Sequence, residues 1–145
     1  MNRQKQKKLL CMDLEGTLIS NAVSQIPRPG LYAFLDSVAE VCDLMLYTSV
    51  SAERVNAIRD LLVKEGVAPA WFLDLSVCHP SGTIKDKARC CRPDALLLDD
   101  QAEVVALGEE SWWVPIAEYL PPYSDDDREL VQALATITSR LGESD

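Results

Sequence analysis

The sequence of 145 residues contains no long hydrophobic run. A membrane-spanning helix requires ~20 consecutive apolar residues, and no apolar run of this chain approaches that length, so we expect no membrane association. Positive charge is also scarce, because 14 lysine and arginine residues stand against 23 aspartate and glutamate residues, for a formal net charge of −9. This negative charge disfavours binding to nucleic acids and anionic membranes.

Interdomain linkers, low-complexity segments and internal repeats are missing too. A chain of this length in which 48% of the residues are hydrophobic can bury one substantial core. We therefore expect a single domain over residues 1–145, in which residues 1–7 form a flexible, solvated arm.

The five cysteines form no C-x-x-C pair. Their odd number, and the position of three of them in or beside apolar runs, are typical of reduced, buried cysteines, so we expect a cytoplasmic location. Cys90, Cys91 and the single histidine, His79, could suggest a zinc site or a Cys/His nucleophile. Adjacent cysteines cannot easily face one ion and no second pair lies at ligand spacing, so we assign these residues no role.

Short apolar runs alternate with amphipathic segments along the chain. The runs predict strands at Lys8–Met12, Leu44–Tyr47, Trp71–Val77, Ala95–Leu98 and Trp112–Ile116. Apolar residues at helical spacing predict helices within residues 27–41, 51–64 and 101–107, and a final helix that residues 124–127 open. This alternation predicts an α/β fold with one doubly wound parallel sheet flanked by helices on both faces.

Polar side chains follow three of the predicted strands, at the point where each strand ends. With a lysine from the loop before the fourth strand, they are Asp13, Glu15, Thr48, Ser49, Lys85, Asp99 and Asp100. In open parallel sheets, ligands bind outside the carboxyl ends of the strands, near the point where the strand order reverses. We therefore expect these groups to meet at one rim of the sheet.

Each of these groups has a function in phosphoryl transfer. Carboxylates from two strand ends can hold Mg²⁺, which prefers a few carboxylate oxygens together with water and phosphate. The cation would let Asp13 approach a phosphate dianion as a nucleophile and form an aspartyl-phosphate. Thr48 and Lys85 would hold the phosphoryl oxygens, and Gly16 permits a tight turn that brings backbone N–H groups toward them.

The same residues can also have purely structural roles. Each motif taken alone fits one, because "DLEG" suits a turn and Thr48, Asp99 or Asp100 can cap a helix. A phosphoacceptor receiver domain also gathers Asp, Thr and Lys at such a rim, but its paired acids come first and its lysine last. Here Lys85 precedes the acidic pair, which argues against a receiver domain.

In order and spacing, the motifs resemble the four motifs of the haloacid dehalogenase superfamily of phosphohydrolases. They are Asp-x-Glu-Gly-Thr, a threonine after an apolar strand, a lysine, and "LLLDD". More narrowly, "RPGLYAFLDSVAEVCDLMLYTS", "IKDK", "ALLLDDQAEV" and "DDDREL" are similar to the NLI-interacting-factor group, which includes the RNA polymerase II C-terminal-domain phosphatases. The resemblance covers about residues 9–141 and implies a Mg²⁺-dependent phosphatase.

The resemblance also implies a role for each site residue. The catalytic residues would be Asp13 as nucleophile, Glu15 as general acid/base and Lys85 as the phosphate-binding lysine. Thr48 would be the phosphate-binding hydroxyl, and we expect Ser49 and Gly16 to hold phosphate as well. Mg²⁺ would be held by Asp13, Glu15, Asp99 and Asp100, with Asp100 at the direct ligand position.

Glu15 departs from the family pattern, which has Asp at this position. The extra methylene moves the carboxyl group by up to ~1.5 Å, and a misplacement near 1 Å can lower a rate about a hundredfold. Metal binding should suffer less, because this position coordinates through its backbone carbonyl in the superfamily. We therefore expect aryl phosphates to be hydrolysed better than serine or threonine phosphates. A phosphate-binding module with weak or no turnover is the alternative.

The substrate is expected to be large. Residues 20–28 and 49–85 are too short to hold a large cap domain beside the elements predicted there, so the site should be open. An open site favours a phosphorylated protein, because enclosed sites bury most of a small ligand. A nucleic-acid end phosphatase is a further alternative, although the acidic charge counts against it.

Overall fold

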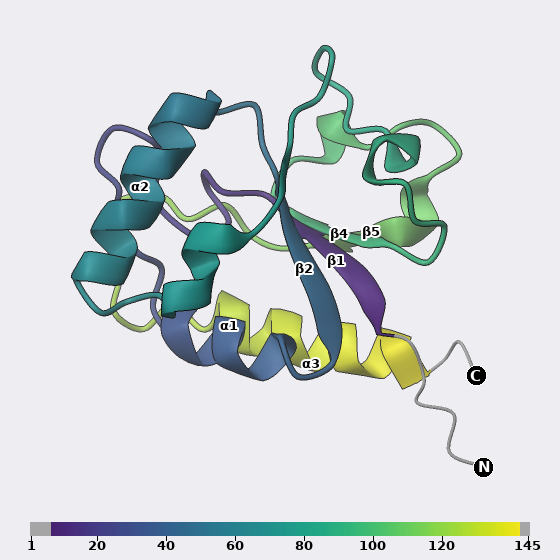
Figure 1. Ribbon diagram of the computed structural model, residues 1–145. Helices are drawn as coiled ribbons and strands as arrows, with labels where there is room; N and C mark the ends of the chain where they lie inside the picture. Colours follow the sequence, from purple (N-terminus) through teal and green to yellow (C-terminus); the bar gives the residue numbers. More distant parts are fainter. Residues whose placement is uncertain (1–6, 143–145) are drawn as a thin grey trace.

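A computed structural model describes residues 7–142 and contains one five-stranded sheet in the order β3-β2-β1-β4-β5 (Figure 1). Every pair of neighbouring strands is parallel. The strands are β1 Lys8–Met12, β2 Cys42–Tyr47, β3 Val77–Cys78, β4 Leu96–Asp99 and β5 Trp113–Pro115. Because the chain moves outward from β1 first through β2 and β3 and then through β4 and β5, the predicted doubly wound α/β fold is confirmed.

The three α-helices pack on one face of this sheet. They are α1 Leu31–Val38, α2 Ala52–Lys64 and α3 Glu129–Gly142, and α1 contacts α3 below the sheet in the view of Figure 1. Apolar residues at helical spacing bring one stripe of each helix into a common core with Leu10 and Met12 of β1. Ser51 caps α2, because its side chain accepts the backbone N–H of Arg54.

Short 3₁₀ helices cover the opposite face. They are η2 Lys87–Cys90, η3 Ala102–Val104 and η4 Glu110–Trp112. Leu9 and Cys11, which alternate with the core residues of β1 on the first face, pack here against Cys90 and Trp112. Parallel strands joined by right-handed crossovers place their connections on opposite faces when the winding direction reverses. Both faces of β1 are therefore buried, which explains its unbroken apolar sequence.

Two predicted elements are wrong. Residues 71–76 do not form a strand, because Ala70–Asp74 is a 3₁₀ helix, η1, that buries Phe72 against the helical face, and of the predicted strand Val77 alone lies in β3. Residues 101–107 do not form an α-helix. Within them, Ala102–Val104 forms the short 3₁₀ helix η3. There the carbonyl of Val104 accepts the backbone N–H of Lys85 at 2.7 Å, and the N–H of Gly108 donates to the Glu110 carboxylate, so helical hydrogen bonding stops.

The start of the last helix also differs from the sequence-based expectation. The helix predicted to open at residues 124–127 begins at Glu129, whose backbone N–H donates to Asp127. The expected arm of residues 1–7 lies outside the described residues except for Lys7, whose ammonium donates to the Ala39 carbonyl. Within residues 7–142, no helix is both long and apolar enough to cross a membrane.

The placement of η1 predicts unequal effects of two adjacent substitutions. Phe72→Ala should lower the free energy of unfolding by about 3–5 kcal/mol, because it empties a fully buried position. Leu73→Ala should cost less than about 1 kcal/mol, since Leu73 is 37% exposed. Urea denaturation of both variants provides the measurement. Equal losses would contradict the 3₁₀ geometry of this segment.

Candidate active site

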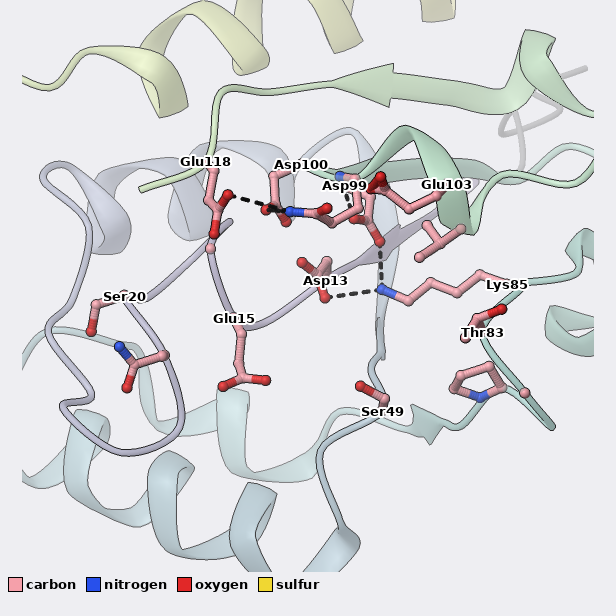
Figure 2. Close-up of a pocket in the computed structure, with 16 residues that line it drawn as sticks. Asp13, Glu15, Ser20, Ser49, Thr83, Lys85, Asp99, Asp100, Glu103 and Glu118 are labelled. Atoms are coloured by element: carbon pink, nitrogen blue, oxygen red, sulfur yellow. Dashed lines mark hydrogen bonds and ion pairs between the residues drawn. The ribbon is translucent and has the colours of Figure 1, made fainter. Parts of the chain in front are cut away.

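The predicted site residues gather at the carboxyl ends of β1 and β4, where the strand order reverses. Asp13 directly follows β1 and Asp99 ends β4. The backbone N–H of Asp13 continues the ladder by donating to the Leu98 carbonyl at 2.9 Å, which places the two carboxylates beside one another. Both line a cavity of about 460 Å³, whose lining side chains are drawn in Figure 2.

Lys85 joins the two buried carboxylates. Its ammonium lies 2.9 Å from Oδ1 of Asp13 and also donates to Oδ2 of Asp99 (Figure 2). Burial lowers the pKa of Lys85, but the two carboxylates outweigh this effect and raise its pKa above the usual value. Since its backbone N–H is bound to the Val104 carbonyl, the loop holds Lys85 at this place as a buried cation.

Asp13, Asp99 and Asp100 form a possible metal-binding group. Each offers a carboxylate oxygen, and these oxygens lie within 4.8 Å of one another. Mg²⁺ binds oxygen at about 2.0–2.1 Å, so ligands on opposite sides of the ion lie about 4 Å apart, and a small inward movement would fit the set to it. Lys85 offsets one of the three carboxylate charges, and a divalent cation would offset the other two.

The pKa values of the aspartates reflect their burial first and the neighbouring negative charge second. Burial raises the pKa of Asp13 well above its usual value, and Asp99 and Asp100 raise it further against the lowering effect of Lys85. Burial likewise raises the pKa of Asp99. A bound cation would stabilise the ionised form of these carboxylates. The chemistry of the three donors therefore suits a metal ion.

Thr17 belongs to the site, although the sequence-based assignment did not include it. Its hydroxyl lies 3.0 Å from Oδ2 of Asp13 and 3.0 Å from Oδ1 of Asp100, and the side chain is fully buried. A hydroxyl group has one hydrogen to donate, and in Thr17 this hydrogen is shared between the two carboxylates. Thr17 therefore links Asp13 to Asp100. In the sequence, this role of Thr17 is indicated by its position in the motif Asp-x-Glu-Gly-Thr.

Gly16 permits the turn and also leaves room for a neighbouring carboxylate. Its φ of +76° lies in the left-handed region, and a Cβ at this position would lie 2.6 Å from Oδ2 of Asp100. The Asp100 carboxylate therefore occupies the volume that the missing side chain leaves. Gln101 also restrains this carboxylate, because its Nε2 donates to Oδ2 of Asp100 at 2.7 Å.

Glu15 lines the cavity, but its carboxylate is directed away from Asp13 (Figure 2). Oε2 accepts the backbone N–H of Ala22 at 2.7 Å. The carbonyl of Ala22 is held in turn by Gln25 and Arg54. The predicted acid/base group is thus bound to the 20–26 loop in this conformation.

The two hydroxyl residues after β2 differ in position. Ser49 lines the cavity, whereas the predicted phosphate-binding residue Thr48 is 1% exposed. The Thr48 hydroxyl oxygen accepts the N–H of Val50 at 3.1 Å, which leaves its hydrogen available for donation. His79, to which the sequence gave no role, binds the Thr48 carbonyl through Nδ1 at 2.8 Å.

Arg28 supports the turn that carries the site, and sequence reasoning did not find it. The guanidinium donates to the carbonyls of Gly16 and Thr17 at 3.2 Å and forms a bidentate ion pair with Asp127. It also lies 5.2 Å from the ring centroid of Tyr119. Its only sequence signal was its place in the "RPGLYAF" segment, because its partners are distant along the chain.

The sequence was compared with known protein families and with curated proteins. The family described as NLI interacting factor-like phosphatase matches residues 8–145, which is nearly the whole chain. No curated protein matches the sequence significantly.

The position of Gly16 under Asp100 predicts a selective loss of metal binding. Gly16→Ala and Gly66→Ala should each cost about 1–2 kcal/mol of stability, since both glycines have a φ near +75°. Gly16→Ala should also weaken Mg²⁺ binding about tenfold or more, because its Cβ displaces the Asp100 carboxylate. Gly66 has open space around its Cβ position and is the matched control.

Calorimetric titration with Mg²⁺, together with thermal unfolding, measures both effects. Equal Mg²⁺ affinity of the two variants would contradict the placement of Asp100 over Gly16.

Proposed function

This chain belongs to the NLI interacting factor-like phosphatase family, and from that premise we propose that it is a Mg²⁺-dependent phosphomonoester hydrolase. The proposed nucleophile is Asp13, which would form an aspartyl-phosphate intermediate. The observation that carries the proposal is the convergence of Asp13, Lys85, Asp99 and Asp100 at the base of an open cavity. A phosphatase needs a positioned carboxylate and cationic charge at one point, and this group supplies the carboxylate and one cation.

The proposed reaction has two displacements. A carboxylate oxygen of Asp13 attacks phosphorus, the bond to the leaving oxygen breaks, and the phosphoryl group remains on Asp13 as an acyl phosphate. Water then attacks the same phosphorus, which releases inorganic phosphate and restores the carboxylate. Lys85 stabilises charge on the transferring phosphoryl oxygens, and Thr17 keeps the Asp13 carboxylate in one orientation.

A metal ion completes this arrangement in the proposal. Asp13, Asp99 and Asp100 would hold Mg²⁺, with the backbone carbonyl of residue 15 as a further ligand suggested by the superfamily resemblance. When bound, the ion supplies charge neutralisation between the carboxylates and the phosphate dianion. Ser49, Thr48 and the Gly16 backbone are proposed to contact the other phosphoryl oxygens.

Proton delivery is the step in which this chain departs from its family. Glu15 is the proposed general acid/base, and it must release the Ala22 N–H before its carboxyl group can turn toward a leaving group. Alkyl phosphates need a proton on the leaving oxygen, whereas aryl phosphates need little protonation. We therefore propose that aryl phosphates are hydrolysed faster than serine or threonine phosphates.

A second candidate function rests on the same hydrogen bond. If the 20–26 loop keeps Glu15 away from the substrate, the chain binds phosphate without efficient turnover and acts as a recognition module. The openness of the site supports a phosphorylated protein as ligand in either case. The net charge of −9 weighs against a nucleic-acid end, and five free cysteines support the cytoplasm as the proposed compartment.

Replacement of the nucleophile should abolish turnover. Asp13→Asn should lower kcat for p-nitrophenyl phosphate in Mg²⁺ by at least ~10³, because the amide cannot form the acyl phosphate. EDTA should abolish the activity of the native chain, and Asp126→Asn, which alters an exposed carboxylate outside the cavity, should leave it unchanged. Full activity of Asp13→Asn would overturn the mechanism. An inactive native chain that binds Mg²⁺ would favour the recognition module.

Shortening Glu15 should restore alkyl-phosphate hydrolysis. Glu15→Asp should raise kcat/KM for a phosphoserine peptide about 10- to 100-fold and change that for p-nitrophenyl phosphate less than about threefold. Glu15→Gln keeps the side-chain length and an oxygen for the Ala22 N–H but removes the acid, so it should lower alkyl hydrolysis selectively. Parallel changes on both substrates in either variant would contradict this role of Glu15.

A further inference from the structure

Carboxylates also surround the outer part of the active-site cavity. Glu15, Glu103 and Glu118 line it in addition to the three inner aspartates, and Figure 2 shows them on different sides of Asp13. Glu103 and Glu118 are exposed, and Glu15 is partly exposed. We call these three residues the acidic rim. They come from three separate segments, which follow β1, β4 and β5.

Positive charge does not balance the acidic rim. Lys85 is the single cation among the lining residues, and it is buried between Asp13 and Asp99. The guanidinium of Arg54 lies behind the loop that binds Glu15, where it donates to the Ala22 carbonyl, and it does not line the cavity. The remaining polar lining is uncharged and includes Ser20, Asn21 and Thr83.

The segment that carries Glu118 is connected to the inner site. Gln101 donates through Nε2 to Oε1 of Glu118 at 3.4 Å and to Oδ2 of Asp100 at 2.7 Å. The next residue, Tyr119, donates its backbone N–H to the Gly16 carbonyl at 2.8 Å. The rim charge is therefore tied to the turn that carries the site.

We propose that the acidic rim selects phosphomonoesters whose leaving group carries positive charge, namely a phosphorylated residue flanked by arginine or lysine in a protein chain. The proposal rests on the phosphatase function proposed above and defines its substrate. Lys85 and a divalent cation would offset the charge of the inner aspartates, but neither would offset the rim. A phosphate dianion adds to the negative charge, so the flanking groups of a favoured substrate must be cationic.

The same rim rejects polyanionic leaving groups. A nucleotide or nucleic-acid end would bring further phosphates against Glu103 and Glu118, and the net charge of −9 would repel it at long range. An exposed ion pair changes an equilibrium constant by up to about fivefold, so two flanking charges and two rim carboxylates can together produce about tenfold selectivity or more.

Peptides that differ only in their flanks test the proposal. Three phosphoserine peptides, flanked by two Arg, two Gln or two Glu, are compared by kcat/KM with the native chain in Mg²⁺, beside a 5′-phosphorylated oligonucleotide. The Arg-flanked peptide should exceed the Glu-flanked one by about tenfold, and the oligonucleotide should be the poorest substrate. Salt should lower kcat/KM for the Arg peptide and raise it for the Glu peptide.

Rim variants then locate the effect. Glu103→Gln combined with Glu118→Gln should reduce the Arg-over-Glu preference to less than about threefold. Glu40→Gln removes an exposed carboxylate beside the amino end of β2, outside the cavity, and should keep the full preference. Equal kcat/KM for the three peptides, an unchanged preference in the double variant, or efficient oligonucleotide hydrolysis would each overturn the proposal.

A binding measurement separates this inference from the phosphatase function. Asp13→Asn, which should not turn over, is titrated with fluorescent forms of the same three peptides. Tighter binding of the Arg-flanked peptide supports the acidic rim even if the native chain hydrolyses nothing. Equal binding of all three, together with turnover of p-nitrophenyl phosphate by the native chain, would reject the rim and leave the phosphatase function standing.

Discussion

The buried ion pairs of Lys85 with Asp13 and Asp99 are the constraint on which the site depends. Removing two carboxylates from water is costly unless a cation lies beside them, and Lys85 reaches both from a loop that is bonded to η3. β1 and β4 are neighbours at the point where the strand order reverses, and this adjacency brings these residues together. The same strand order therefore determines both the fold and the site, because it concentrates charged side chains where the two halves of the sheet meet.

The turn that contains Gly16 and Thr17 is restrained by further contacts around the site. Arg28 fixes the carbonyls of Gly16 and Thr17 and is itself held by Asp127, just before α3. Thr17 links Asp13 to Asp100, and the absent side chain of Gly16 makes room for that carboxylate. Residues from both ends of the chain thus restrain the carboxylate oxygens of Asp13 and Asp100. Such restraint is what nucleophilic attack on a bound phosphate requires.

Local signals explain what the sequence could predict. The apolar spacing of α1 and the cap at Ser51 act within a few residues, and the alternation of strands and helices identified the fold and the convergence of Asp13, Lys85, Asp99 and Asp100. Contacts between distant segments explain what it could not predict. The Lys85 N–H ends helical hydrogen bonding after η3, and the Ala22 N–H holds the Glu15 carboxylate away from Asp13. The partners of the Arg28 guanidinium are distant along the chain. Nor does a sequence tell which of the adjacent Thr48 and Ser49 faces the cavity, because successive side chains point in different directions.

In the proposed mechanism, Asp13 carries the phosphoryl group during turnover. The decisive experiment is to mix the native chain with Mg²⁺ and an aryl phosphate, quench it with acid within the first turnovers, and map the covalent phosphate by mass spectrometry after peptide digestion. We expect a phosphoryl group on Asp13 that hydroxylamine removes, as is typical of an acyl phosphate. Phosphate on another residue, or hydrolysis with no covalent phosphate on the protein at any time, would contradict the mechanism.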